Sequence, residues 1–480
     1  MLLSVTTRDE SWRGRGQRRH GLQAAPIVSL LLLATAVAAH GQAQSNSAAA
    51  DAAGTGRPAV ITLEDAIRLA QVSEPAYAAA AAASRNAGLD KSIARAGLLP
   101  NVAYFNQGLY TEPNGAHGQV GQFSDTADLP KFIANNGVRE YFSQAIVNET
   151  LGLVPVAAVR RADAAAAMAS AEQEIARRGL VAAVTTLFYT SLAADHKLTV
   201  AEEARQEAAD FTKLTTEREQ AREAAHADVV KAELLEQQRD REAEDAKVAA
   251  EKAHLELGVL LFSDPRTSFT LSAPEGTTPL PSREDVQQAA ARSNPELKSA
   301  LAALAASNAE VQAAWGALLP NVGLNVTYGI DAPQFAVNGP SNPNGDGTKT
   351  RNLGYSASVT VNIPIWDWLA SEHKVKQSEI RRDVAQVALS ATQRRLIAQL
   401  DEAYSETQAA GDQLESLGKS VATAAESLRL TKLRYQGGEA TVLEVVDAEN
   451  AYVTAENARA DGRVRYESAR AALETITGKM

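Results

Sequence analysis

Glu444 and Asp447 are the side chains whose types and spacing point most directly to chemistry. They lie three positions apart, soon after the pair Gly437–Gly438, so on a helix that follows a glycine turn their carboxylates would share one face. Neighbouring carboxylates can attract cations. Taken alone, however, the pair is more typical of two solvated acids on a helix surface, so the surrounding elements must decide its role.

Other residue patterns that would support catalysis are missing from the sequence. With no cysteine among 480 residues, the chain has no disulfide, no Cys-ligated zinc and no thiol nucleophile. The seven histidines form no H-E-x-x-H spacing, and no G-x-S-x-G elbow occurs. Gly418–Lys419–Ser420 resembles the end of a phosphate loop, but it lies inside a heptad-patterned helix. We therefore expect no enzyme, no cofactor and no metal.

Charge and hydropathy narrow the class of protein further. Acidic residues outnumber basic ones by 58 to 47, which argues against a nucleic-acid partner. Ala24–Ala39 is the only continuously apolar segment and is short for a membrane span. Arginines before it and small residues after it predict a secretory signal cleaved between residues 38 and 43, and Arg18–Arg19 leaves a twin-arginine signal open. We assign 1–43 to the signal peptide and 44–60 to a disordered lead-in.

The rest of the chain is a tandem duplication. The segment LLPNV at Leu98–Val102 recurs 220 residues later at Leu318–Val322, and the same offset aligns Pro75 with Pro295. A Pro/Ser/Thr-rich linker separates the two copies. The predicted boundaries are 61–262 for the first repeat, 263–282 for the linker and 283–480 for the second repeat.

Each repeat is predicted to run helix, strand, loop, strand, long helix, turn, long helix. The Ala-rich run that opens each copy predicts one helix ending before Pro100 or Pro320. In the second repeat, apolar residues alternate with small or polar ones over about ten positions, as in membrane barrel strands. A soluble hairpin with one wet face explains that stretch equally well. Strands are predicted at about 98–111, 138–151, 318–331 and 355–367, with exposed loops at Thr111–Gly137 and Asp331–Gly354.

The helices after the strands are predicted to be very long. Between residues 368 and 436 the sequence has no proline, and apolar or small residues alternate at spacings of four and three, as a coiled-coil seam requires. Gly437–Gly438 interrupts this run, and a second helix follows to the C-terminus. The first repeat follows the same plan at 155–221 and 228–262.

Together these features resemble the TolC family of outer-membrane efflux proteins over nearly the whole mature chain. The residues that carry the resemblance are the two LLPNV segments, the stretch YQGGEATVLEVVDA at Tyr435–Ala448, and its shorter echo at Ala227–Glu233. The resemblance implies a mainly α fold with a membrane β-barrel part. Three identical chains would share one twelve-stranded barrel, which closes the sheet edges that lipid does not tolerate. Their long helices would continue the barrel as a coiled-coil tunnel.

The same resemblance implies a function and partners. The chain would be a passive exit duct of an efflux or type I secretion system, in contact with outer-membrane lipid. It would act as a homotrimer in the cell outer membrane, with its tunnel in the periplasm. A periplasmic adaptor (membrane fusion) protein and an inner-membrane transporter would dock with it. The substrate stays open.

By resemblance, Glu444 and Asp447 are the acids of the periplasmic pore constriction. Three chains would bring six carboxylates into one ring, which would attract cations and raise the pKa values of some of them. In the first repeat, Lys231 stands where the second has Asp447, so the first hairpin should add less negative charge.

The resemblance also assigns an entrance lock to Tyr435 and Asp228. The family's lock includes an arginine at the position that Ala440 occupies here, so we expect this entrance to be held closed less firmly, unless Arg434 or Arg222 substitutes. The expected hairpin tips, which would contact the adaptor, contain Arg222, Ala225, Gly437 and Gly438.

Two alternatives to a channel are a structural periplasmic coiled-coil protein and an efflux adaptor subunit. Neither explains two copies of barrel-like strands, and both should wash off a membrane without detergent. Trp366 and Trp368, where the last strand becomes a helix, are interpreted equally well as a membrane-interface anchor or as a packed elbow.

Overall fold

The computed structural model describes residues 59–110, 139–272, 279–341 and 349–478. The predicted signal peptide, nearly all of the lead-in and the predicted loop Thr111–Gly137 lie outside these residues. The chain divides into two units, Met1–Ala59 and Val60–Met480. The description that follows concerns the second unit.

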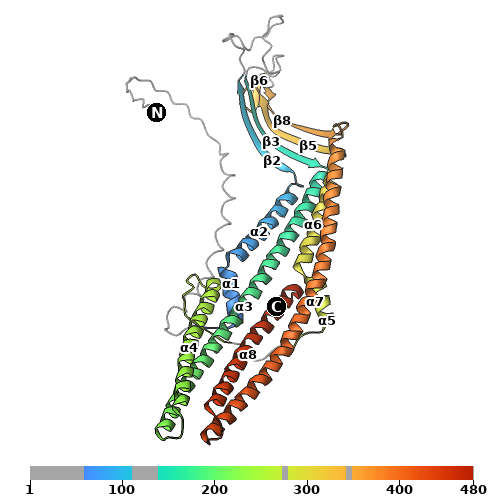
Figure 1. Ribbon diagram of the computed structural model, residues 1–480. Coiled ribbons are helices and arrows are strands. Elements are labelled where there is room, and N and C mark those ends of the chain that lie inside the picture. The colour runs from blue at the N-terminus through green and yellow to red at the C-terminus, as the bar shows by residue number, and fades with distance from the viewer. Residues whose placement is uncertain (1–58, 111–138, 273–278, 342–348, 479–480) are drawn as a thin grey trace, which may run out of the picture. The chain divides into compact units, whose positions relative to one another are not determined.

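The two repeats contain the same helices and long strands in the same order (Figure 1). Their short helices have 11 and 22 residues in both copies, and the second helix of each long hairpin has 36. The first repeat consists of α1 (Leu63–Ser73), α2 (Pro75–Ala96), β2 (Asn101–Tyr110), β3 (Arg139–Leu151), α3 (Leu153–Gln220) and α4 (His226–Leu261). The second consists of α5 (Arg283–Ser293), α6 (Pro295–Gly316), β5 (Asn321–Ala332), β8 (Leu353–Asn362), α7 (Ala370–Gln436) and α8 (Val442–Thr477).

The Ala-rich run that opens each repeat forms two helices, so the prediction of a single helix was wrong. The break falls at Glu74–Pro75 in the first copy and at Asn294–Pro295 in the second. Proline has no N–H to donate, and its ring pushes the preceding residue out of the helical region. Each proline therefore starts a new helix after an extended residue, and we call these two breaks the elbows.

The four long strands form one antiparallel sheet in the order β2-β3-β5-β8. Its register places apolar residues opposite each other, with Leu324 across from Val359 and Tyr328 across from Tyr355. The predicted strands 98–111 and 318–331 begin later, at Asn101 and Asn321, because the LLP segments before them form turns. The predicted strand 355–367 begins earlier, at Leu353, and ends at Asn362, before Pro364, which cannot donate a ladder hydrogen bond.

Two short strand pairs complete the described structure. β1 (Ala59–Ile61) pairs with β4 (Phe269–Leu271), and β6 (Asn338–Ser341) pairs antiparallel with β7 (Lys349–Arg351). The second pair lies within the predicted loop Asp331–Gly354.

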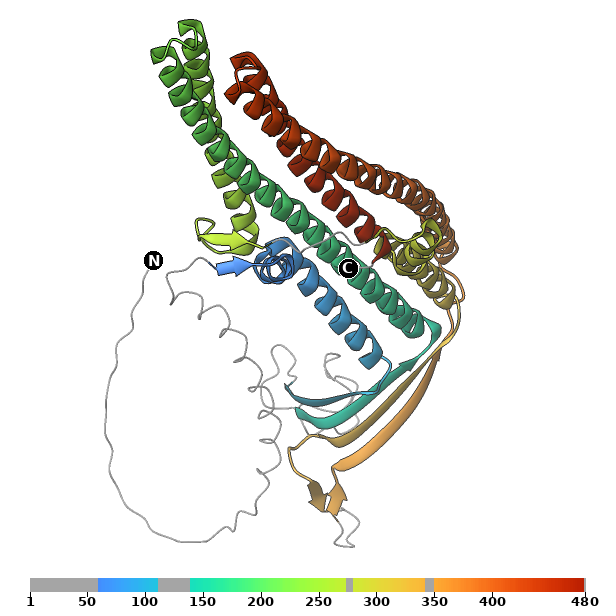
Figure 2. The same cartoon turned by 90° about the horizontal axis from the view of Figure 1, so that it is seen from below.

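The long helices extend away from the sheet, so that the sheet lies at one end and the helical turns at the other (Figure 2). α3 has 68 residues, which corresponds to about 100 Å of helix. It packs against α4 of its own hairpin and also against α2, α6 and α8. α7 packs against α6 and α8. Alanine dominates the buried positions of these helices, which lets their backbones approach closely.

The larger side chains are buried where the short helices meet the long hairpins. One cluster joins α1, α3, α4 and β4 through residues such as Phe188, Leu257 and Phe269. A smaller one joins α5, α7 and α8 around Leu400 and Leu473. Within the described ranges, no helix is both long and apolar enough to cross a membrane.

Candidate functional site at the hairpin tips

The two helical hairpins turn in the same way at their tips. In the first, Glu223 N donates to Arg218 O at 2.8 Å, and in the second, Glu439 N donates to Arg434 O at 2.8 Å. Both turns need one residue with a positive φ, which is Arg222 in the first and Gly438 in the second. Glycine adopts this conformation without steric cost, whereas arginine does not. The predicted tip residues Arg222, Ala225, Gly437 and Gly438 all lie in these turns and are exposed.

The helices that follow the turns begin differently. α8 starts with a capping box, in which Glu444 N donates to Thr441 Oγ1 at 3.3 Å and Thr441 N donates to Glu444 Oε1 at 3.2 Å. At the start of α4, Ala225 occupies the cap position and offers no side-chain acceptor. Asp228 occupies the place that Glu444 has in α8, so both residues lie in a first turn, where the helix dipole favours an acid.

Glu444 and Asp447 both lie on the exposed side of α8, while Val442, Val445 and Ala448 face the interior. The hydrogen bonds from the Thr441 backbone and hydroxyl, together with nearby Arg434, lower the pKa of Glu444. This direction in the single chain is opposite to the one expected for a crowded ring. The ring would involve several chains, so the expected pore constriction stays a prediction.

Tyr435 is buried at the end of α7, where it contacts α3. Its ring lies 5.2 Å from that of Phe211, and the Arg218 guanidinium lies 4.8 Å above it. Arg218 also donates to the carbonyl oxygens of Tyr435 and Gln436, each at 3.0 Å. The Tyr435 hydroxyl makes a longer contact of 3.4 Å with Thr215 Oγ1. These contacts join the end of the second hairpin to the first hairpin.

The other members of the predicted lock are placed less closely. Asp228 is half-buried on α4, and in the described part of the chain it shares no hydrogen bond or ion pair with Tyr435. Ala440 packs beside the Tyr435 cluster. Arg434 is engaged within its own turn, with its guanidinium on Glu439 O at 3.0 Å and on Glu444 Oε2 at 3.3 Å. A lock formed by Tyr435 and Asp228 therefore stays a prediction.

Sequence reasoning missed a buried ion pair that joins the two hairpins above the tips. Arg239 of α4 lies with its Nε 3.6 Å from Glu449 Oε1 of α8 and donates to Asn450 Oδ1 at 2.6 Å. Both charged side chains are almost fully buried, and burial raises the pKa of Glu449. Removing one partner of such a pair leaves an uncompensated buried charge. No motif marks these residues, since charged side chains are frequent on all four long helices.

The polar side chains at the tips connect helices to one another and to the turns. The described residues hold no cluster of three or more His, Asp or Glu side chains that could bind a metal ion. The polar groups present form caps, ion pairs and helix-to-helix contacts. Such contacts can hold two hairpins together or release them.

Comparison with known proteins extends this picture. Residues 286–479 match the profile of the family described as outer membrane efflux protein. The fold resembles that of VceC, an outer membrane protein of Vibrio cholerae, with 17% identity, a TM-score of 0.68, and coverage of 87% of this chain and 96% of VceC. It also resembles the Neisseria gonorrhoeae MtrE outer membrane channel in its open state (18% identity, TM-score 0.67, coverage 87% and 88%).

A third similar structure is the Campylobacter jejuni CmeC outer membrane channel, with 16% identity, a TM-score of 0.66, and coverage of 87% of this chain and 85% of CmeC. No curated protein matches the sequence significantly. The likeness therefore covers both repeats at the level of the fold and the second repeat at the level of the sequence.

Proposed function

We propose that this chain, whose residues 286–479 match the outer membrane efflux protein family, forms a trimeric channel in the outer membrane. It would act as a passive exit duct for substrates that an inner-membrane transporter delivers. The duct would do no chemistry of its own.

The observation that carries this proposal is the open sheet. β2 and β8 are its edge strands, and within the described residues each has only one neighbour. Unpaired backbone N–H and C=O groups are very costly in lipid, so an open four-stranded sheet cannot span a membrane alone. Pairing β8 of one copy with β2 of the next removes both edges. Three copies would close a barrel of twelve strands.

In β5 and β8 the two faces of the sheet differ in the way that a membrane barrel requires. One face exposes apolar residues such as Val326, Tyr328 and Val359. On the other face, Asn325 Nδ2 donates to Asn148 Oδ1 at 2.6 Å, and Thr327 Oγ1 donates to Ser356 Oγ at 3.3 Å. An apolar outer band and a polar lumen are typical of outer-membrane barrels.

Three tryptophans support the same placement of the sheet in a membrane. Trp315, Trp366 and Trp368 are all exposed where the sheet meets the helices, and the rings of the latter two lie 5.8 Å apart, edge to face. Tryptophan is enriched at the headgroup level of membranes. Their exposure favours the interpretation of Trp366 and Trp368 as a membrane-interface anchor over that of a packed bend between the last strand and the helix after it.

At the opposite end, the exposed tips would meet a periplasmic adaptor. Arg222, Ala225, Gly437 and Gly438 form the outermost turns, and docking there could bias the contacts between Tyr435 and α3. Opening would then be a movement of the second hairpin away from the first, and closed and open states would differ by a few contacts.

Single-channel conductance of the detergent-extracted protein in a planar bilayer with a salt gradient tests the proposal. We expect a small, cation-selective conductance for the wild type and a larger one when Tyr435→Ala and Asp228→Ala are combined. Tyr435→Phe is the matched control, because it keeps the ring against Phe211 and Arg218. No conductance from either the wild type or the double variant would overturn the proposal.

A further inference from the structure

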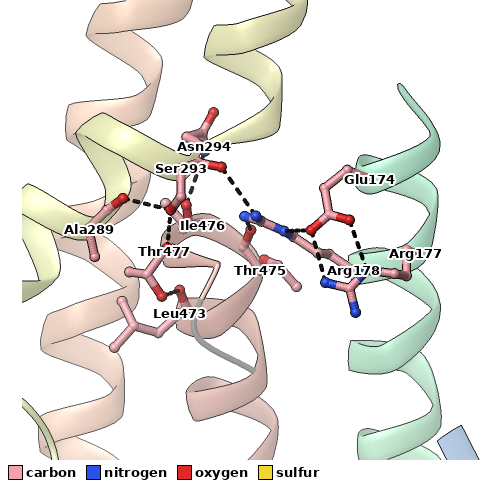
Figure 3. Close-up of polar contacts among 10 residues, drawn as sticks. All are labelled: Glu174, Arg177, Arg178, Ala289, Ser293, Asn294, Leu473, Thr475, Ile476 and Thr477. Atoms are coloured by element: carbon pink, nitrogen blue, oxygen red, sulfur yellow. Dashed lines mark hydrogen bonds and ion pairs between the residues drawn. The ribbon is translucent and has the colours of Figure 1, made fainter. Parts of the chain in front are cut away.

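Within one chain, a buried arginine of the first repeat binds two separate parts of the second repeat (Figure 3). Arg178 of α3 donates to Thr475 O at 3.0 Å, near the end of α8, and to Ser293 O at 3.1 Å, at the α5–α6 elbow. Glu174 Oε1 accepts from Arg178 Nε at 2.7 Å. Asn294 Nδ2 adds a bond to Ile476 O at 3.3 Å. We call this set of contacts the junction.

The first repeat contains a corresponding elbow and a corresponding helix end, although α4 ends at extended Phe262 where α8 ends at left-handed Gly478. Ser73 Oγ donates to Leu261 O at 3.2 Å, just as Ser293 Oγ donates to Thr477 O. The elbows are 220 residues apart along the chain, and α4 and α8 are 216 residues apart. Compared with the junction in the second repeat, this second junction lacks the long helix that carries the arginine, and it has Glu74 where the first has the donor Asn294.

The counterpart of Arg178, 216 residues later, is Arg394 on α7. Arg394 is exposed, and among the described residues its Nε contacts the backbone oxygen of Ser390 alone, at 3.4 Å. Ser390 stands where α3 has Glu174, so α7 lacks the carboxylate that accompanies Arg178. The missing carboxylate is on the elbow instead, where Glu74 stands in place of Asn294. The charges thus balance if α7 packs on the α1–α2 elbow.

The apolar residues around these positions support the same packing. Ile380, two heptads before Arg394 on α7, is 64% exposed, whereas its counterpart Ala164 on α3 is 7% exposed. On α2, Leu89 is 62% exposed, whereas its counterpart Ala309 on α6 is 2% exposed. Two surfaces that are free in one chain are therefore the counterparts of two surfaces that bury each other in the same chain.

Arg394 cannot reach this elbow within its own chain without rearrangement. α7 contacts α6 and α8, while α1, α2 and α4 pack on α3. The described part of one chain supplies no occupant for either free surface, and a second copy of this chain carries the complementary surface. Head-to-tail repetition of such a contact gives a ring when the rotation between copies closes, as the proposed trimer requires.

We propose that Arg394 completes the second junction between copies, by binding the end of α4 and the α1–α2 elbow of the next copy. In this arrangement Arg394 pairs with Glu74 of the partner subunit and donates to the backbone oxygens of the partner subunit's Ser73 and Val259. The inference rests on the proposed trimer and specifies which residues hold it together.

Cross-linking tests the geometry, because the wild-type chain has no cysteine. Glu74→Cys combined with Arg394→Cys should be linked between copies by a short bis-maleimide, giving covalent dimers and trimers in denaturing gels. The matched control is Glu74→Cys with Glu415→Cys, which places the second thiol about 30 Å further along α7. The control should stay monomeric in the gel.

Substitution tests the energetics. Arg394→Ala should lower the temperature at which the detergent-purified trimer dissociates, Arg394→Lys should recover part of the loss, and Glu74→Gln should weaken the trimer while keeping the acceptor for Ala76 N. The control is Arg395→Ala, whose counterpart Gly179 is exposed.

The outcomes separate the two proposals. A wild type that is monomeric in detergent and in bilayers would contradict the proposed trimer itself. If the wild type is a trimer, the junction between copies would be overturned, and the channel left intact, by an Arg394→Ala trimer as stable as the wild type and a Glu74→Cys/Arg394→Cys variant that gives no cross-linked species.

Discussion

At the scale of single residues, Glu444 and Asp447 differ more than their spacing indicates. Glu444 closes a capping box and contacts Arg434, so a local structural role already explains a glutamate there. Asp447 is exposed and, in the described part of the chain, takes part in no hydrogen bond or ion pair. Asp447 is therefore the stronger candidate for an acid that faces a pore.

We predict that Asp447→Asn reduces the cation preference of the channel and that Glu444→Gln reduces it as well. Glutamine at this position still completes the capping box, so neither change should unfold the tip. In the single chain, hydrogen bonds from Thr441 lower the pKa of Glu444. The reversal potential in a salt gradient measures the preference.

A charge reversal on the other hairpin tests the same prediction in the opposite direction. Lys231 occupies in α4 the place that Asp447 has in α8, so Lys231→Asp should increase the cation preference. Reversal potentials that stay at the wild-type value in all three variants would show that these side chains do not face the pore.

At the scale of elements, the tips show how two equivalent helices are stabilised unequally. Thr441 caps α8, whereas Ala225 leaves the first N–H groups of α4 without a side-chain acceptor. As far as these caps determine it, the α3–α4 tip should therefore open more readily than the α7–α8 tip. The contacts that each tip makes with neighbouring helices add to this difference or offset it.

We predict that Thr441→Ala destabilises the start of α8 by about 1 kcal/mol and that Ala225→Ser stabilises the start of α4 by a smaller amount. Hydrogen exchange of the backbone amides at the two tips measures both effects separately. Faster exchange in the first turn of α8 and slower exchange in that of α4 are expected. Equal exchange in wild type and variants would contradict this account.

The sequence predicted the elements well where local patterns determine them. The LLPNV repeats, the heptads and the Gly437–Gly438 pair located the strands and the long hairpins to within a few residues. The elbows were missed, because the alanines around Pro75 and Pro295 favour helix on both sides. The contacts of Tyr435 could not be predicted, since Arg218 and Phe211 belong to the other repeat and meet it only through tertiary packing.

At the scale of the whole molecule, the duplication has a structural consequence. One chain contains, between its two repeats, the same kind of junction that we propose between copies. α3 of the first repeat binds the elbow and helix end of the second, and this internal junction holds the two repeats together. Its stability should therefore limit the stability of the protomer, whereas the junction between copies should limit that of the assembly.

Glu174 makes the internal junction sensitive to acid. Hydrogen bonds and charge from Arg177, and then from Arg178, lower the pKa of Glu174 from its ordinary 4.5 to about 2. A carboxyl with a depressed pKa stabilises the folded state fully above pH 4.5, and this stabilisation is lost as the pH falls toward about 2. A shift of this size corresponds to about 3 kcal/mol. Because a third of the side chain is exposed and water screens the pair, we expect about 1–2 kcal/mol.

We predict that Glu174→Gln lowers the unfolding temperature at neutral pH and flattens its dependence on pH between about 5 and 2. Thermal unfolding of wild type and variant across this range measures both effects. Ser390→Glu is the matched control, because it adds a carboxylate beside Arg394, where the single chain has no junction to close. It should leave protomer unfolding unchanged. Wild-type and Glu174→Gln proteins that lose stability in parallel on acidification would show that the acid sensitivity of the protomer lies elsewhere.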